Sequence, residues 1–192
     1  MNIYPSPKGL VIFESKYGAT RQYAEWMAAS LTLPLTATAE VSMLQLQQAD
    51  FLVIGTPVYN GVFRIKNWLK KHVKEVSGKK LFFFVVNATA AAEQAKRDQF
   101  VLNSIPPEIR QETSVYFLPG RLVHRQLNFF DRLMLSVAAR LMNDPVKKEA
   151  MRRDIDGVKK EYIDALVMAV SGYRGIRNNF VPSGREAAPV AG

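Results

Sequence analysis

The chain has 192 residues, no cysteine and a formal net charge of +9 at pH 7. The absence of cysteine excludes disulfides, thiolate metal sites, iron–sulfur clusters and thiol nucleophiles, so any redox chemistry must come from an organic cofactor. A chain of this length with 48% hydrophobic residues favours one well-cored domain. Because we find neither a run of about 20 apolar residues nor a secretory signal, we expect a cytoplasmic protein.

The positive charge is concentrated in the middle and late parts of the chain. Residues 1–60 carry three basic and four acidic side chains, whereas residues 61–120 and residues 121–160 each carry ten basic and five acidic ones. A basic surface attracts polyanions, so nucleic acid and anionic lipid are both candidate partners. We find no nucleic-acid-binding motif with interleaved aromatic residues, and therefore expect no nucleic-acid partner.

The first predicted elements are a strand, a turn and a helix. An apolar segment at residues 10–13 predicts a buried strand, and apolar residues at helical spacing predict a helix over 20–31. The hexad between them is Ser15-Lys16-Tyr17-Gly18-Ala19-Thr20. Two hydroxyls, a glycine that allows close approach and the free N–H groups of a helix start together favour a phosphate site at this turn.

Further apolar segments alternate with amphipathic ones along the chain. Strands are predicted at 51–54, 81–86 and 115–118, with a weaker one near 35–41, and helices at 65–76, 127–142 and 157–173. Strands that are apolar throughout and alternate with helices indicate a parallel sheet covered on both faces, an α/β fold. We expect one domain over residues 1–177 and a disordered tail over 178–192.

Two later loops complete a candidate cofactor site, because ligands of open α/β sheets bind beyond the carboxyl ends of the strands. The loop after 51–54 offers a stiffening proline, a flat ring and an uncrowded glycine; its candidate residues are Thr56, Pro57, Tyr59, Asn60 and Gly61. The loop after 81–86 offers small side chains with amide and hydroxyl groups, and its candidates are Asn87, Thr89 and Ala90. One phosphate loop and two loops that suit a planar ring favour flavin mononucleotide (FMN).

On these residues the chain resembles the flavodoxin-like FMN proteins. Their phosphate loop usually reads hydroxyl, x, Thr or Tyr, Gly, x, Thr after the first strand, and Ser15, Tyr17, Gly18 and Thr20 match this pattern. The resemblance covers about residues 9–175 in the order of elements. It implies a doubly wound five-stranded parallel sheet with strand order 2-1-3-4-5, helices on both faces, and FMN as the cofactor.

Within that family the chain is most similar to the menaquinone-dependent protoporphyrinogen dehydrogenase branch. The similarity rests on the spacing from Gly55 to Gly61, on Gly120-Arg121-Leu122, and on the run from Phe129 to Met134 that leads into a basic and apolar helix. It implies an oxidoreductase that passes electrons from an organic substrate to a quinone. Arg121 and His124 are candidate substrate-side residues.

Three functions remain open at this point. We find no constellation of catalytic side chains and expect no metal site, since a flavin transfers hydride or electrons without a side-chain acid or base. The alternatives to an enzyme are a flavodoxin-type electron carrier and a flavin-free binding module. Shuttle flavodoxins are generally acidic, so the basic charge of this chain disfavours a soluble shuttle.

The predicted helix at 127–142 has an apolar side and basic neighbours. Phe130, Leu133, Met134, Val137 and Leu141 share one side, and basic residues lie on or near the helix within residues 125–148. Such a helix suits an anionic membrane surface, so we expect peripheral contact at the inner face of the membrane. Core packing and a homodimer interface are the alternatives.

Overall fold

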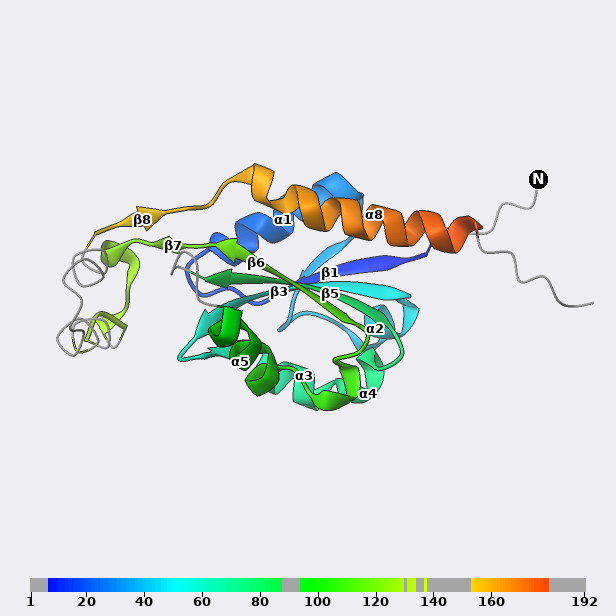
Figure 1. Ribbon diagram of the computed structural model, residues 1–192, viewed down its shortest axis with the longest axis horizontal. Coiled ribbons are helices and arrows are strands. Elements are labelled where there is room, and N and C mark those ends of the chain that lie inside the picture. Colours follow the sequence, from blue (N-terminus) through cyan, green and yellow to red (C-terminus); the bar gives the residue numbers. More distant parts are fainter. Residues whose placement is uncertain (1–6, 88–93, 130, 134–136, 138–152, 180–192) are drawn as a thin grey trace, which may run out of the picture.

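The computed structural model describes residues 7–87, 94–129, 131–133, 137 and 153–179. A parallel sheet lies between two layers of helices (Figure 1). Its strand order is β2-β1-β3-β5-β6, and every neighbouring pair in this path is parallel. The strands are β1 (Gly9–Phe13), β2 (Leu35–Ala37), β3 (Phe51–Tyr59), β5 (Lys80–Asn87) and β6 (Thr113–Pro119). Counted along the chain, these five strands have the predicted order 2-1-3-4-5, which is confirmed.

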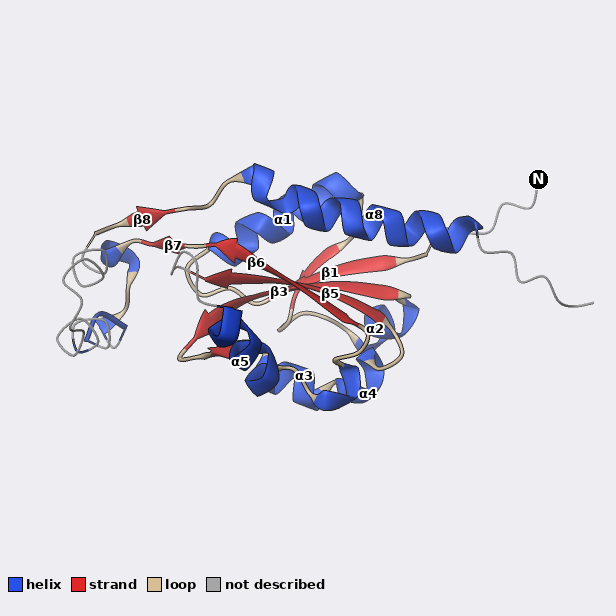
Figure 2. Cartoon of the chain, in the orientation of Figure 1, coloured by secondary structure: helices blue, strands red, loops and turns tan. Residues whose placement is uncertain are grey.

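The two faces of the sheet are covered by different helices (Figure 2). One face packs on α1 (Ala19–Leu31) and α8 (Asp164–Asn179), and buries Tyr23 and Leu166 between them. The other face is covered by α2 (Met43–Gln48), α3 (Lys66–Lys71), α4 (Val73–Val76) and α5 (Gln94–Ser104). Because successive side chains of a strand point to opposite faces, the apolar strands contribute side chains to the hydrophobic core on each face of the sheet.

Close packing within the sheet depends on a glycine. A Cβ on Gly55 would lie 2.1 Å from Cζ of Phe84, whose side chain is fully buried. The ring of Phe84 therefore fills the space that any larger residue at position 55 would need. Gly55 marks the expected end of its strand, but β3 continues past it to Tyr59.

Several predicted elements have different bounds in the structure. The predicted helix 65–76 is divided at His72 into α3 and α4, since His72 has non-helical dihedral angles (φ −110°, ψ 21°). The predicted helix 157–173 begins later, with the 3-10 turn η3 (Lys160–Ile163), and α8 then runs to Asn179. The predicted strand 35–41 contains only the three residues of β2. Another 3-10 turn, η1 (Pro107–Ile109), precedes β6.

A hairpin follows β3. Asn60 (φ 50°) and Gly61 (φ 75°) both have positive φ, and they join β3 to the antiparallel strand β4 (Val62–Phe63) through a two-residue loop. Positive φ at both central residues is the requirement of a type I′ turn, which the Asn-Gly pair meets at low cost. The tight turn places the ring of Tyr59 at the carboxyl edge of the sheet.

The chain makes an excursion after β6. It leaves through β7 (Arg121–Leu122) and returns through β8 (Ile155–Asp156), which pair antiparallel with Arg121 opposite Asp156. The Tyr23 hydroxyl of α1 donates to Pro119 O (2.9 Å) and accepts from Lys159 N (3.4 Å), so it holds both sides of the excursion. Its described part holds a 3-10 turn, η2 (His124–Gln126), and helical residues at 129, 131–133 and 137.

The remaining predictions for this region are only partly covered. Leu127 precedes the helical residues, so the helix predicted over 127–142 begins two residues later; Phe130, Met134 and Leu141 lie outside the described residues. Of the tail predicted over 178–192, residues 178 and 179 belong to α8, and residues 180–192 lie outside the described residues. Within the described ranges, we find no helix with the length and apolar character needed to cross a bilayer.

Candidate functional site

A cavity of about 310 Å³ opens at the carboxyl edge of the sheet. It is bounded by the loop after β1, the end of β3, the β6–β7 connection and the excursion. Its lining residues are Lys16, Tyr17, Ala19, Thr20, Pro57, Val58, Tyr59, Asn60, Val86, Gly120, Arg121, Leu122, Leu127 and Asp131. Segments distant in sequence thus meet at the place where α/β sheets bind ligands.

The loop after β1 presents the start of a helix. Gly18 is the N-cap of α1 with φ 84°, a conformation that suits glycine, and no side chain caps the helix there. The Gly18 N–H donates to Ser15 Oγ at 3.2 Å, which closes the loop. The first turn of α1 holds no acidic residue. Thr20, in this turn, is 2% exposed and is one of the residues that line the cavity. These features together suit an anion.

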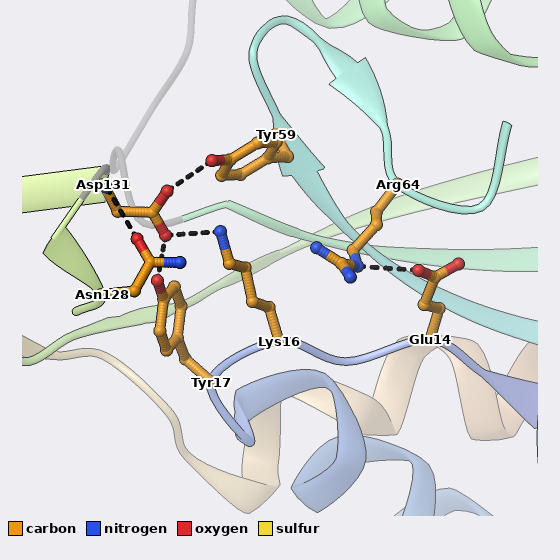
Figure 3. Close-up of polar contacts among 7 residues, drawn as sticks. All are labelled: Glu14, Lys16, Tyr17, Tyr59, Arg64, Asn128 and Asp131. Atoms are coloured by element: carbon orange, nitrogen blue, oxygen red, sulfur yellow. Dashed lines mark hydrogen bonds and ion pairs between the residues drawn. The ribbon is translucent and has the colours of Figure 1, made fainter. Parts of the chain in front are cut away.

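A buried carboxylate from the excursion joins the loop and β3 (Figure 3). Asp131, which is 6% exposed, accepts hydrogen bonds from the hydroxyls of Tyr17 and Tyr59. Its Oδ2 also lies 2.5 Å from Lys16 Nζ. The Asp131 N–H donates to Asn128 Oδ1 at 2.8 Å, so the side chain of Asn128 caps the turn that leads to Asp131. One side chain therefore ties three separate parts of the chain together.

The ionisation of these groups follows from their contacts. Burial alone would raise the pKa of Asp131, but hydrogen bonds from Lys16, Tyr17 and Tyr59 outweigh it and hold the pKa below its ordinary 3.8. Burial alone would lower the pKa of Lys16, and its contact with Asp131 outweighs this and raises it. Burial, with the bond to Asp131, raises the pKa of Tyr17. At neutral pH Lys16 and Asp131 therefore form an ion pair.

The residues predicted at the end of β3 have different positions. Pro57, Tyr59 and Asn60 line the cavity. Thr56 is fully buried, and its hydroxyl accepts from Ile65 N (3.2 Å) and donates to Pro57 O (3.2 Å). Thr56 thus stabilises the connection from β4 to α3, and neither it nor Gly61 is among the lining residues.

The other predicted site residues also divide. Arg121 lines the cavity and is held by Asp156 (2.8 Å) and by Gln22 Oε1 (3.1 Å). His124 is not a lining residue; its backbone N–H and ring Nδ1 both contact Asp154 Oδ1, at 2.8 and 2.9 Å. Asn87 ends β5, where its carbonyl accepts from Gly120 N at 2.9 Å. Thr89 and Ala90 lie outside the described residues.

The sequence prediction missed Asp131 and Asn128. Asp131 is 114 residues from Tyr17 in sequence, so local patterns do not pair them. One signal was available: Asp131 is an acid within an apolar and basic segment, Phe129-Phe130-Asp131-Arg132-Leu133. An isolated acid in such surroundings calls for a cationic or hydrogen-bonding partner.

Comparison with protein families gives a match to the Flavodoxin_5 family, described as a flavodoxin domain, over residues 10–148, which is well over half of the chain. Comparison with curated proteins finds no match. Similar solved structures include a flavodoxin from the domain Archaea (13% identity, 69% of this chain and 97% of that one, TM-score 0.40). A flavoprotein in complex with FMN from Lactobacillus acidophilus has 15% identity, with 59% and 93% covered and a TM-score of 0.41. The azoreductase AzrA has 11% identity, with 75% and 98% covered and a TM-score of 0.44.

Proposed function

Because the chain belongs to the Flavodoxin_5 family of flavodoxin domains, we propose that it binds FMN and works as an oxidoreductase. The observation that carries this proposal is the uncapped start of α1 at Gly18, placed at the edge of a cavity walled by Tyr17 and Tyr59. A dianion is favoured at such a helix start, and a planar ring is favoured between aromatic walls.

The residues present suit the two ends of FMN. Ser15, Gly18 and Thr20, with the backbone N–H groups of the first turn of α1, would hold the phosphate. Pro57, Tyr59 and Asn60 would border the ring. The lack of a Cβ at Gly18, with no atom within 4 Å of where one would be, leaves room for close approach of phosphate oxygens. FMN would supply hydride or single-electron transfer, and the chain would supply position and charge.

We propose an enzyme rather than a soluble electron carrier, on the basis of charge. The chain has a net charge of +9, and among the charged side chains that line the cavity Lys16 and Arg121 are cationic and Asp131 is anionic, so the lining has a net positive charge. A positive cavity favours anionic substrates over docking to a basic redox partner. Hydrogen removed from an organic substrate would pass to a quinone, which becomes a quinol. Protoporphyrinogen, whose carboxylates are anionic, is the specific substrate that we propose.

An exposed apolar face beside the cavity supports membrane contact. Phe129, Leu133 and Val137 follow one another at helical spacing and are 75%, 50% and 44% exposed. Arg125 and Arg132 are also exposed. Apolar side chains flanked by arginines suit the interface of an anionic bilayer, where a quinone would be available.

A spectrum of the purified protein tests the cofactor. Titration of the apoprotein with FMN should quench flavin fluorescence and give a 1:1 complex. A protein that leaves flavin fluorescence unchanged would favour the flavin-free binding module. For the complex, anaerobic reduction followed by a menaquinone analogue separates the other two functions: multiple turnovers with protoporphyrinogen support the enzyme, and one-electron reduction without quinone turnover supports a carrier.

Co-sedimentation tests the membrane contact. The full chain should pellet with liposomes that contain anionic lipid at low salt, and less so with neutral liposomes or at high salt. A variant with Phe129→Ser and Leu133→Ser should stay in solution, whereas Met168→Ser, at an apolar residue 73% exposed on α8, is the matched control. Absence of lipid-dependent pelleting of the wild type would contradict this proposal.

A further inference from the structure

We propose that Asp131 is a positioning residue, which fastens the described residues around it in the excursion to the cavity wall and sets the directions of Lys16, Tyr17 and Tyr59. The part of the proposal that concerns FMN rests on the proposed function. The part that concerns the fastening stands on the geometry of the chain alone.

The first argument is the convergence of donors on one side chain. Lys16 and Tyr17 come from the loop after β1, Tyr59 comes from the end of β3, and all three contact the Asp131 carboxylate (Figure 3). An ionised carboxylate is an acceptor with about four lone-pair sites and no hydrogen to donate, so it can satisfy several donors at once. An amide or a hydroxyl at this position would satisfy them only in part.

The second argument is the way the excursion presents this side chain. Leu127 (7% exposed) and Asp131 (6% exposed) are four residues apart and line the cavity, whereas Phe129 and Leu133 are exposed. Asn128 fixes the turn between them, because its Oδ1 accepts from Asp131 N and its carbonyl accepts from Arg132 N at 3.0 Å. Arg132 also donates to His124 O at 3.1 Å. The backbone is thus arranged to deliver the carboxylate inward.

The third argument is the effect on the cavity wall. Lys16 Nζ lies 4.1 Å from the centroid of the Tyr59 ring and 5.3 Å from that of Tyr17, and it is 2.5 Å from Asp131 Oδ2. The carboxylate of Asp131 keeps the ammonium of Lys16 next to these rings. Without the carboxylate, the ammonium would move toward solvent, because a buried charge without a partner is costly. Asp131 therefore determines which surface the cavity offers to a ring.

Hydrogen exchange of the apoprotein tests the fastening directly. In Asp131→Asn, which keeps the side-chain volume, peptides around Asp131 and peptides containing Lys16 and Tyr17 should exchange at least about tenfold faster than in the wild type. The double variant Tyr17→Phe/Tyr59→Phe should give a smaller increase in the exchange rate of the peptides around Asp131. Because its substitutions lie in other elements, such an increase would come from the lost contacts with Asp131. Asp98→Asn and Tyr162→Phe, at exposed residues, are the controls.

Release of FMN tests the consequence for the site. After dilution of the complex, the recovery of flavin fluorescence should be at least about tenfold faster in Asp131→Asn than in the wild type. If Asp131→Asn does not fold, Tyr59→Phe and Tyr17→Phe replace it, with an expected increase of about two- to fivefold each.

The outcomes separate the two proposals. Unchanged exchange around Asp131 in both the Asn and the double Phe variants would overturn the fastening, whether or not FMN binds. Slower release or tighter binding in Asp131→Asn would mean that the carboxylate opposes FMN, and would also overturn the inference. A wild type that shows the expected exchange pattern but binds no FMN would count against the proposed function alone.

Discussion

The ammonium of Lys16 lies 4.1 Å from the centroid of the Tyr59 ring. Lys16 belongs to the loop after β1 and Tyr59 to the end of β3, so this contact joins the two loops in which sequence patterns predicted a phosphate site and a ring site. Both side chains line the same cavity. The phosphate end and the ring end of the candidate site are therefore electrostatically connected through one lysine.

Tyr59 contributes a ring and a hydroxyl, and the two can be separated. Tyr59→Phe keeps the ring but loses the bond to Asp131, and should raise the dissociation constant for FMN by about two- to fivefold. Tyr59→Ala also removes the aromatic wall, and should weaken FMN binding by about 0.5–1.5 kcal/mol more than Tyr59→Phe does. Fluorescence titration measures both. Equal effects of the two substitutions would show that the ring does not contact the flavin.

The phosphate loop gives a prediction with a defined size. Ser15→Ala combined with Thr20→Ala should lower FMN affinity by about 1–3 kcal/mol, because phosphate oxygens and backbone donors are left less well paired. The same titration with riboflavin, which lacks the phosphate, is the control and should show little change. Unchanged FMN affinity in the double variant would mean that the phosphate binds elsewhere.

Packing inside the sheet predicts a change of stability with a matched rescue. Gly55→Ala places a Cβ 2.1 Å from Cζ of Phe84 and should reduce the free energy of unfolding by about 1–3 kcal/mol. Adding Phe84→Leu should restore part of this loss. Gly172→Ala, on an exposed turn of α8 with no atom near its Cβ position, should instead stabilise by about 0.5–1 kcal/mol. Urea unfolding measures all three, and a neutral Gly55→Ala would contradict the packing argument.

The lowered pKa of Asp131 predicts how its contribution depends on pH. A carboxyl group whose pKa is lower in the folded than in the unfolded state stabilises above its unfolded pKa, and this stabilisation is lost as pH falls through the folded value. The difference in free energy of unfolding between the wild type and Asp131→Asn should therefore be constant between about pH 7 and pH 5, and shrink only below about pH 4.

Urea unfolding at a series of pH values checks this. Asp98→Asn, at an exposed residue whose carboxyl group lies on α5, is the control. A difference that already narrows between pH 7 and pH 5 would show that Asp131 titrates there and is not held as an anion by Lys16.

The fold was predictable where burial alone determines it. The central strands β1, β3 and β5 are buried on both faces, so each contains a continuous apolar run, and these runs predicted the parallel sheet. The strand order was implied by the resemblance to the flavodoxin-like proteins. The end of β3 was not predictable in the same way. Thr56, Pro57 and Tyr59 look like loop residues, but Thr56 is buried by its bonds to Pro57 and Ile65, and the Asn60-Gly61 turn returns the chain as β4.

The site was predictable where it is local. Ser15 and Gly18 lie in the loop after β1 and Thr20 in the first turn of α1, so their spacing alone was enough to predict the anion site, which stays a prediction. Asp131 and Arg121 enter the site through the excursion, whose position depends on the pairing of β7 with β8 and on contacts with α1. Short two-residue strands carry no periodic signal, so a sequence pattern cannot show that residue 131 returns to residues 16 and 59.

The β7–β8 ribbon separates the excursion from the rest of the fold. Arg121 stands directly opposite Asp156, and Tyr23 holds Pro119 on the way out and Lys159 on the way back. Because the two ends are already fixed side by side, the length of chain between them affects the entropy of closure only weakly. Insertions and deletions between β7 and β8 can thus accumulate without moving a strand of the parallel sheet. The wall of the cavity that the excursion supplies can therefore vary in length, provided that Asp131 still reaches Lys16, Tyr17 and Tyr59.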